Sequence, residues 1–399
     1  MKRLEEGFLS RLFTNVDVGV DLGTSNLLIF LPERGIVYRE PSMVAIDKTN
    51  GKVVAVGRRA KEMLGKTPDR IDVVQPLAGG VVADYEATAG MLGTVLERVV
   101  GRNIFFKPRL MVCIPTGVTS VEKRAVIEAC AQAGAARTFL IEEPLAAAIG
   151  ADIDVREAKG RMVVDIGGGT TDVAVISLGG IVASKALRIG GNKFDEAIVR
   201  YLKKDLNIQV ADYVAEEIIL QIGCVSRLGM HGDMLVRGRD QITGLPTALR
   251  MTSRDTMRAM GEPASQILSC IRSVFEKTPP ELAADILSEG IVLTGGGALL
   301  EGLADVVQSA THIRTKVAKD PLDCVAIGAG KAFSHSVIMD GLLHQESQLH
   351  HRRGAAVRRP VFICMRGNKK HEHKTNWANP DHCASSKSYG WFGHGSNHQ

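Results

Sequence analysis

The chain has 399 residues, 45% of them hydrophobic and 23% charged, so it is long enough for two or three domains with cores of their own. The net charge of +5 is concentrated in residues 346–399, which carry +6 and leave −1 on the rest of the chain. A nearly neutral body of this kind excludes the basic surface that binds nucleic acids.

Residues 1–15 form an amphipathic pattern at the start of the chain. Five apolar side chains fall on one helical face, and charged or polar side chains take the other: the apolar set is Leu4, Phe8, Leu9, Leu12 and Phe13. The pattern predicts a helix that lies in a membrane interface, although a helix packed on the body would show it too. Charges interrupt every apolar run, which excludes a signal peptide, and no run approaches the ~20 apolar residues of a membrane span.

Residues 18–31 predict a first glycine hairpin. An apolar strand ends near Asp21, a turn of Gly23, Thr24, Ser25 and Asn26 follows, and a second apolar run begins at once. Farther along, strands over 35–56, a short helix over 58–64, a helix over 87–100 and a buried strand over 110–115 are expected. Residues 65–67 imitate the end of a P-loop, but no strand precedes them and the first glycine is missing, so they are not a phosphate site.

Two helix starts follow. Thr119 and Glu122 have the spacing of a capping box, for a helix that ends at Gly134. A strand over residues 140–141 then delivers Glu142 and Glu143 to a helix that begins at Pro144. Carboxylates at this position can act simply as partners of the helix dipole.

Residues 162–177 predict a second hairpin, and it organises the chain. Two β-branched strands flank Gly167, Gly168 and Gly169, whose backbone N–H groups can approach an anion where a Cβ would intrude. Thr170 and Thr171 add hydroxyl donors, and Asp165 can hold a hydrated Mg²⁺. A plain glycine-rich turn would look similar, but the first hairpin repeats the same plan. Internal duplication predicts two halves that grip one nucleotide between them.

The second half continues with a strand over 181–189 and helices over 195–202 and 214–223. A long helix over 254–277 is expected to bend or break at Gly261 and Pro263. Residues 290–300 then form a third glycine cluster, in which Gly295, Gly296, Gly297 and Ala298 follow a strand. Bare backbone there suits a base or ribose.

A helix is expected over 300–310, and Asp320 and Pro321 precede a last helix that runs through Phe333 and packs back on the first half. Beyond Ser334 the chain is polar and basic without periodicity, which predicts disorder. Residues of the zinc-ligand types occur there at no standard spacing: Cys364, His371, His373, His382 and Cys383. The seven cysteines include no C-x-x-C pair, which is typical of free thiols in a reducing cytosol.

Together the three glycine clusters and residues 140–150 and 276–286 resemble the MreB family of bacterial actin-like ATPases, over about residues 16–333. The resemblance implies an α/β fold of the two-domain actin type, each half a mixed sheet flanked by helices, with a nucleotide cleft between them. Domain I would span 16–150, completed by about 322–334, and domain II 151–321. An N-terminal helix over 1–15 and a tail over 335–399 would flank them.

The resemblance also implies ATP and Mg²⁺ as cofactors. Glu143, with Thr170, would position the attacking water, and Asp21 and Asp165 would hold Mg²⁺ through water. The nucleotide would contact Thr24, Ser25, Asn26, Gly167, Gly168, Gly169, Thr170, Glu216, Glu217, Ile219, Gly295, Gly296, Gly297 and Ala298. Two positions depart from the family pattern, because Asn192 replaces an aspartate and Ile219 replaces a lysine.

Membership implies cytoplasmic filaments of the chain itself, attached to the inner face of the cell membrane, that organise cell shape with the cell-wall elongation machinery. The alternative is a monomeric nucleotide-gated switch of the chaperone or kinase type. A chaperone would need a β-rich peptide-binding domain that the roughly 65 polar residues of the tail do not supply. A kinase would need an acceptor pocket with its own base, for which no motif is found.

Overall fold

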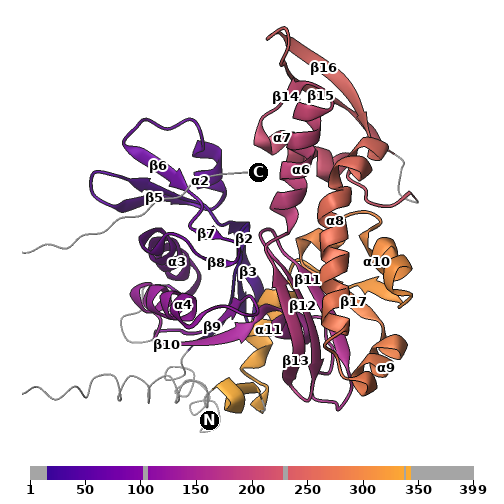
Figure 1. The fold of residues 1–399 in the computed structure, drawn as a ribbon. Coiled ribbons are helices and arrows are strands. Elements are labelled where there is room, and N and C mark those ends of the chain that lie inside the picture. Colours follow the sequence, from indigo (N-terminus) through magenta and orange to yellow (C-terminus); the bar gives the residue numbers. More distant parts are fainter. Residues whose placement is uncertain (1–15, 102–106, 228–231, 337, 343–399) are drawn as a thin grey trace, which may run out of the picture. The chain divides into compact units, whose positions relative to one another are not determined.

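Two five-stranded sheets form the centre of the computed structural model, which describes residues 16–101, 107–227, 232–336 and 338–342. The first sheet contains β1 (Asp17–Leu22), β2 (Asn26–Leu31), β3 (Gly35–Pro41), β9 (Arg109–Ile114) and β10 (Arg137–Glu142). The second contains β11 (Arg161–Ile166), β12 (Thr171–Ser177), β13 (Gly180–Leu187), β17 (Ile291–Thr294) and β18 (Thr315–Val317). Figure 1 shows the two sheets in their separate halves of the chain.

The two sheets have the same plan, with strand orders β10-β9-β1-β2-β3 and β18-β17-β11-β12-β13. In each, the first strand of a glycine hairpin lies at the centre, pairs antiparallel with the second strand and pairs parallel with a later one. The internal duplication predicted from the two hairpins is therefore present in the topology.

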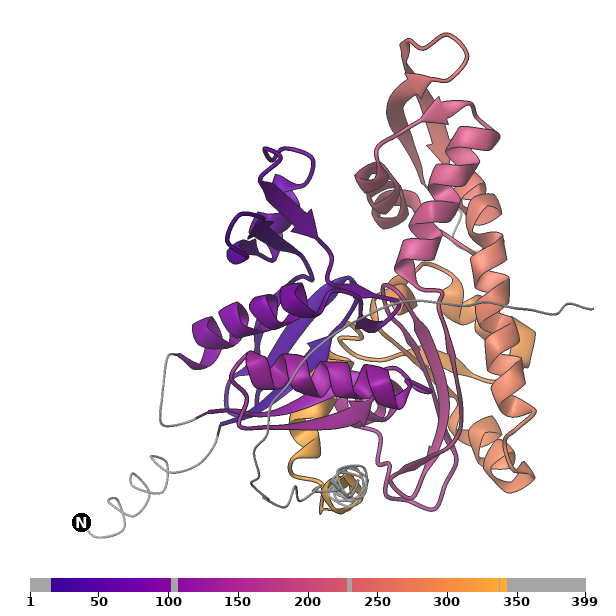
Figure 2. The same ribbon diagram turned by 60° about the vertical axis from the view of Figure 1, so that its left-hand side comes forward.

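Helices α3 (Tyr85–Val100) and α4 (Ser120–Gln132) cover one face of the first sheet, as Figure 2 shows. They bury Leu92 and Val126 in a core with Val20 of β1. The predicted capping box of α4 is confirmed: the Thr119 N–H donates to Glu122 Oε2 at 2.8 Å, and the Glu122 N–H donates to Thr119 Oγ1 at 3.3 Å. This satisfies two of the N–H groups that a helix start leaves without an intrahelical partner.

Helix α5 (Glu143–Gly150) contacts both sheets, and α11 (Cys324–Ala332) packs on α5 and on the first sheet. Their apolar side chains share a core with Met111 of the first sheet and Val163 of the second. A Cβ added at Gly19 of β1 would lie 2.5 Å from the Gly330 nitrogen, so only glycine permits this close approach of strand and helix. The predicted return of the last helix to the first half is confirmed, and Ile338 extends the same core.

The second sheet is contacted by α8 (Ser253–Phe275), α9 (Pro280–Glu289), α10 (Leu303–Thr311) and the 3₁₀ helix η2 (Gly296–Leu299), and α6 (Gly191–Lys204) packs on α8. The predicted interruption of the long helix is wrong, because α8 passes Gly261 and Pro263 unbroken. A helix-interior proline costs about 3 kcal/mol. Here Pro263 is itself buried, and burial of Met260 and Ile267 in the same core offsets that cost.

A small sheet stands at the outer end of each half. In the first half it has the order β5-β4-β6, with β4 (Val44–Asp47), β5 (Lys52–Val56), β6 (Ile71–Val74) and helix α2 (Arg58–Met63). In the second it consists of β14 (Ile208–Gln209), β15 (Asp233–Asp240) and β16 (Pro246–Thr252), with α7 (Asp212–Ile222) against it. A two-stranded ribbon of β7 (Leu77–Ala78) and β8 (Val81–Val82) completes the first half.

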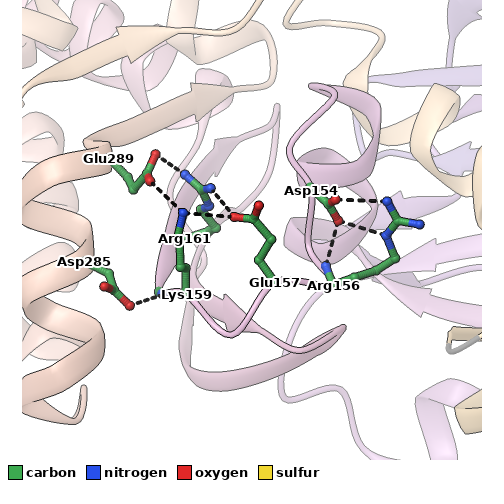
Figure 3. A network of polar contacts seen from close by, with 8 residues as sticks. Asp154, Arg156, Glu157, Lys159, Arg161, Asp285 and Glu289 are labelled. Atoms are coloured by element: carbon green, nitrogen blue, oxygen red, sulfur yellow. Dashed lines mark hydrogen bonds and ion pairs between the residues drawn. The ribbon is translucent and has the colours of Figure 1, made fainter.

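A polar network fixes the start of β11, the strand that carries Asp165 (Figure 3). Arg161 forms ion pairs with Glu289 at the end of α9 and with Glu157, the latter at 2.9 Å. The Gly160 N–H donates to Asp285 Oδ2 at 2.8 Å. These bonds hold the connection from α5 to β11 against α9, so the strand enters the second sheet at a defined place.

None of the helices in the described part of the chain combines the length and apolar character needed to cross a bilayer. The five cysteines in this part are all buried and free of disulfides. The predicted membrane helix over 1–15, the tail beyond residue 342 and the five zinc-type residues lie outside the described residues.

Candidate functional site

A cavity of 580 Å³ lies where the hairpins of the two halves meet. Fifteen of the residues predicted from the sequence line it: Asp21, Thr24, Ser25, Asn26, Glu143, Asp165, Gly167, Gly168, Gly169, Thr170, Glu216, Ile219, Gly295, Gly296 and Gly297. They come from β1, β2, α5, β11, α7 and η2 and from the turns beside these elements. The structure therefore gathers residues that span most of the sequence into one site.

Two predicted contact residues do not line the cavity. Glu217 is exposed on α7 and accepts a hydrogen bond from Gln221 Nε2 at 3.0 Å. Ala298 is 2% exposed and packs into the core of the second half. Neighbouring helical residues point about 100° apart, so Glu216 can face the cavity while Glu217 faces solvent.

The first hairpin presents hydroxyl groups. Thr24 is buried, and its Oγ1 accepts a hydrogen bond from the Gly80 N–H at 2.8 Å. Ser42 Oγ donates to the Gly23 carbonyl at 2.6 Å, which fixes the turn between β1 and β2. Gly23 permits this tight turn, because a Cβ at its position would lie 2.7 Å from the Asn26 carbonyl oxygen.

The second hairpin presents bare backbone to those hydroxyls. A Cβ at Gly168 would lie 1.9 Å from Ser25 Oγ, and a Cβ at Gly169 would lie 2.6 Å from Thr24 Oγ1. The start of α6 is tied to the same turn, because the N–H groups of Gly191 and Asn192 donate to the carbonyls of Gly167 and Gly168. Glycines in the second turn thus let the two hairpins approach directly.

Three carboxylates converge on the cavity, and burial is the largest cause of the raised pKa of each. Burial, followed by the charges of Asp165 and Asp323, raises the pKa of Asp21 to about 8. Burial raises the pKa of Asp165 to about 6. A hydrogen bond that Thr294 Oγ1 donates to Asp165 Oδ1 at 2.7 Å acts in the opposite direction and lowers this pKa. Glu143 is 7% exposed, and burial together with the charges of nearby aspartates raises its pKa well above the ordinary value.

This donor set fits a hydrated magnesium ion. Oxygen ligands suit Mg²⁺, which in proteins is held by one or two carboxylates and keeps several waters. Asp165 is buried and Asp21 is partly buried, and their raised pKa values show that an ionised carboxylate is costly at either position. A divalent cation next to them would remove that cost, so the residues present match the group.

Two buried residues of the site escape the sequence analysis. Thr294 ends β17 and holds Asp165; its place just before the third glycine cluster was the available signal. Asp172 is fully buried, and its Oδ1 accepts hydrogen bonds from Thr116 N at 2.6 Å and Thr116 Oγ1 at 2.8 Å. Asp172 lies directly across the β11–β12 ladder from Asp165, a pairing that hairpin register could have predicted.

The two departures from the family pattern both lie at the cavity. Asn192 Oδ1 accepts a hydrogen bond from Ser25 Oγ at 3.1 Å, and so joins the two halves beside the glycine turn. An amide accepts this bond without adding a carboxylate charge. Ile219 lines the cavity and packs against the core of the second half.

Comparison with known proteins decides the family. The family model described as MreB/Mbl protein matches residues 15–340. The chain belongs to the MreB/Mbl family. It is 44% identical to the cell shape-determining protein Mbl of Bacillus subtilis (strain 168), covering 79% of this chain and 94% of Mbl. It is 46% identical to the cell shape-determining protein MreB of Escherichia coli (strain K12), covering 84% of this chain and 98% of that MreB.

Solved structures agree with this membership. MreB5 of Spiroplasma citri bound to ADP has a TM-score of 0.76 and 34% identity, covering 82% of this chain and 98% of that one. The same protein bound to AMPPNP gives a TM-score of 0.76 at 35% identity, with 82% and 99% covered. A MamK double helical filament matches with a TM-score of 0.68 at 23% identity, over 80% of this chain and 99% of that one, which shows a shared fold. The predicted two-domain actin-like fold and the cytoskeletal family are confirmed.

Proposed function

We propose that the cavity binds ATP with Mg²⁺ and hydrolyses it, and that the nucleotide cycle controls filaments of this chain. The observation that carries the proposal is the facing pair of hairpins, hydroxyls on one and bare glycine backbone on the other, around a cavity of 580 Å³. Hydroxyl and backbone donors from two sides suit a polyphosphate chain. A family relative that covers most of this chain was solved with ADP and with AMPPNP.

Each glycine cluster has its own part in this proposal. Thr24, Ser25 and Asn26 would bind phosphate oxygens from the first half, and the N–H groups of the turn before Thr170 would bind them from the second. The third cluster leaves backbone open where the nucleoside would lie. Asp21 and Asp165 would hold the Mg²⁺ waters, and the ion when bound would neutralise the charge on the phosphate oxygens.

Glu143 is the proposed catalytic residue. It lines the cavity at the first turn of α5, and its carboxylate can accept a hydrogen bond from a water molecule. Thr170 lines the same cavity from the second hairpin and can supply a second hydrogen bond to that water. Fixing the water removes orientational freedom before the reaction, which is a main source of rate enhancement in phosphoryl transfer.

We further propose that domain I spans residues 16–150 with about 322–334, and domain II 151–321, and that closure around ATP changes a contact between copies. Contact between a head and a tail of identical subunits does not close on itself and gives filaments. The relatives named cell shape-determining proteins support a role in cell shape and cell-wall synthesis. Residues 1–15 would attach the filament to the cytoplasmic face of the membrane, many weak helices acting together.

Sedimentation and electron microscopy test the filament. Protein lacking residues 352–399 should pellet with ATP and Mg²⁺ above a critical concentration, with and without anionic liposomes, and pellet less without nucleotide. Replacing Phe8 and Phe13 with glutamate should abolish flotation with liposomes and preserve pelleting in solution. Protein that stays monomeric at every concentration, on liposomes as in solution, would refute the filament.

A further inference from the structure

An ion pair joins the small outer parts of the two halves. Lys61 lies on α2, beside the β5-β4-β6 sheet, and Glu216 lies on α7, beside the β14-β15-β16 sheet. Figure 1 shows α2 and α7 on facing sides of the two halves. Lys61 Nζ donates to Glu216 Oε2 at 3.0 Å, across a sequence separation of 155 residues.

The pair stands where the cavity meets solvent. Glu216 lines the cavity, yet its side chain is 52% exposed, and that of Lys61 is 47% exposed. Asp195, which also lines the cavity, lies near enough to Glu216 and Lys61 to feel both charges. The contact therefore bridges the mouth of the cavity.

Charge at this mouth is mostly negative. Asp195 has a pKa raised to about 6, by burial first and then by the charge of Glu216, and further acids at 196 and 212 add to the rise. Among the groups that act on the pKa of Asp195, Lys61 is the cation, while Lys193 forms its own ion pair with Glu196 at 2.6 Å. Helix α7 contains no Lys or Arg within its bounds, so the neutralising charge comes from the other half.

We infer that the Lys61–Glu216 pair closes the mouth of the cavity over a bound nucleotide, and that Lys61 thereby slows nucleotide release. This rests on the proposed nucleotide binding. The reason is geometric: α2 and α7 belong to different halves, so any opening that separates them must break the pair. It is also electrostatic, because loss of Lys61 removes the positive charge that acts on both Glu216 and Asp195.

The size of the effect follows from exposure. Half-exposed ion pairs contribute little, and removing one should speed release by about threefold. The effect should shrink with added salt, because dissolved ions screen exposed charges. The screening length is about 10 Å at 0.1 M salt and shorter at higher salt. Lys61 is therefore a positioning residue, outside the chemistry itself.

A double-mutant cycle on the full chain tests the pair, with release of a fluorescent ADP analogue followed by stopped flow. Lys61→Gln should release about three times faster than wild type at low salt. In a Glu216→Gln background, Lys61→Gln should change the rate by less than about 1.5-fold, because the partner charge is gone. Arg59→Gln removes the same charge from the same helix without a partner on α7, and should release at the wild-type rate.

Equal acceleration by Lys61→Gln in both backgrounds would overturn the pair, since Lys61 would then act on another group. An unchanged rate for Lys61→Gln in protein that binds the analogue would overturn the inference and leave the proposed function standing. A wild-type protein that binds no analogue would refute the proposed function itself.

Discussion

The two glycine hairpins share a backbone plan and differ in what they present to the cavity. The turn after β1 carries one glycine and the hydroxyls of Thr24 and Ser25. The turn after β11 carries three glycines, and a Cβ on the middle one would fall 1.9 Å from Ser25 Oγ. The two hairpins repeat one backbone plan. The side chains of Thr24 and Ser25 in the first turn occupy the space beside the second turn, where the glycines carry no Cβ.

The hairpin carboxylates differ in the same way. Thr294 donates to Asp165 at 2.7 Å, and the pKa of Asp165 rises only to about 6. Burial raises the pKa of Asp21 to about 8, with the charges of Asp165 and Asp323 adding to the rise. The second hairpin therefore holds its charge with a built-in donor, while the first depends more on what binds.

A larger side chain in the turn after β11 should have the largest effect, because it removes the main difference between the two hairpins. Gly168→Val places a branched side chain on Ser25, and overpacking of this kind costs up to about 3 kcal/mol, or about a hundredfold in ATP affinity by calorimetry. Ser25→Gly in the same chain should recover part of the loss, because it vacates the space. A double variant no better than Gly168→Val would mean that the two turns do not meet as described.

Replacing each hairpin aspartate with asparagine should change the free energy of unfolding by a different amount at the two positions. The native state holds the Asp21 proton up to about pH 8 while the unfolded chain loses it near 3.8, so this contribution to stability is present below about pH 4 and lost as the pH rises to about 8. Asp21→Asn should therefore raise the free energy of unfolding at pH 8, without nucleotide or Mg²⁺, by about 2 kcal/mol or more. Asp165→Asn should gain less. Urea titrations at pH 5 and pH 8 measure both, and an equal gain would contradict the assigned difference.

Thr294→Val makes Asp165 resemble Asp21. Loss of a hydrogen bond to a buried carboxylate costs about 1.5 kcal/mol. The free energy of unfolding at pH 8 should fall by that amount and should decline more steeply between pH 5 and pH 8 than in wild type. Thr315→Val, on β18, serves as the matched control, because the Thr315 hydroxyl donates at 3.0 Å to the Ile313 carbonyl and its loss should not change the pH profile. A pH profile parallel to that of wild type would remove Thr294 as the partner of Asp165.

The smallest effect is expected outside the hairpins. Ile219→Lys puts a cation on α7, which has none, and should tighten ATP binding by about 1 kcal/mol through one partly exposed charged contact. Calorimetry compares the variant with wild type. Equal or weaker binding would show that the apolar packing of Ile219 matters more than the missing charge.

Short-range patterns explain how much the sequence could predict. The hairpins, the capping box of α4 and the start of α5 at Glu143 and Pro144 depend on neighbours within a few residues, and all are present. The repeated hairpin predicted two halves around one nucleotide, and the resemblance to the MreB family supplied the actin-type fold. Helix α8 did not follow its local signals, because burial around Pro263 outweighs the proline penalty.

The remaining parts of the site depend on contacts between distant residues. Thr294 reaches Asp165 across 129 residues, Thr116 reaches Asp172 across 56 and Lys61 reaches Glu216 across 155. Thr294 and Asp172 had weak local signals, the third glycine cluster and the hairpin register, but Thr116 and Lys61 are ordinary polar residues in their own segments, and no local pattern names the partner of any of them. Ala298 lies beside three glycines, which predicted a ligand contact, and the structure places its methyl group in the core.

ATP hydrolysis by the Glu143→Ala variant tests most directly the central claim that Glu143 positions the attacking water. Single-turnover phosphate release is compared with wild type, and ATP affinity is measured on the same preparations. The proposed mechanism predicts unchanged affinity and release slower by at least about tenfold, a loss of ~1.4 kcal/mol or more in transition-state stabilisation. Phosphate release at the wild-type rate would contradict it and remove Glu143 from the reaction.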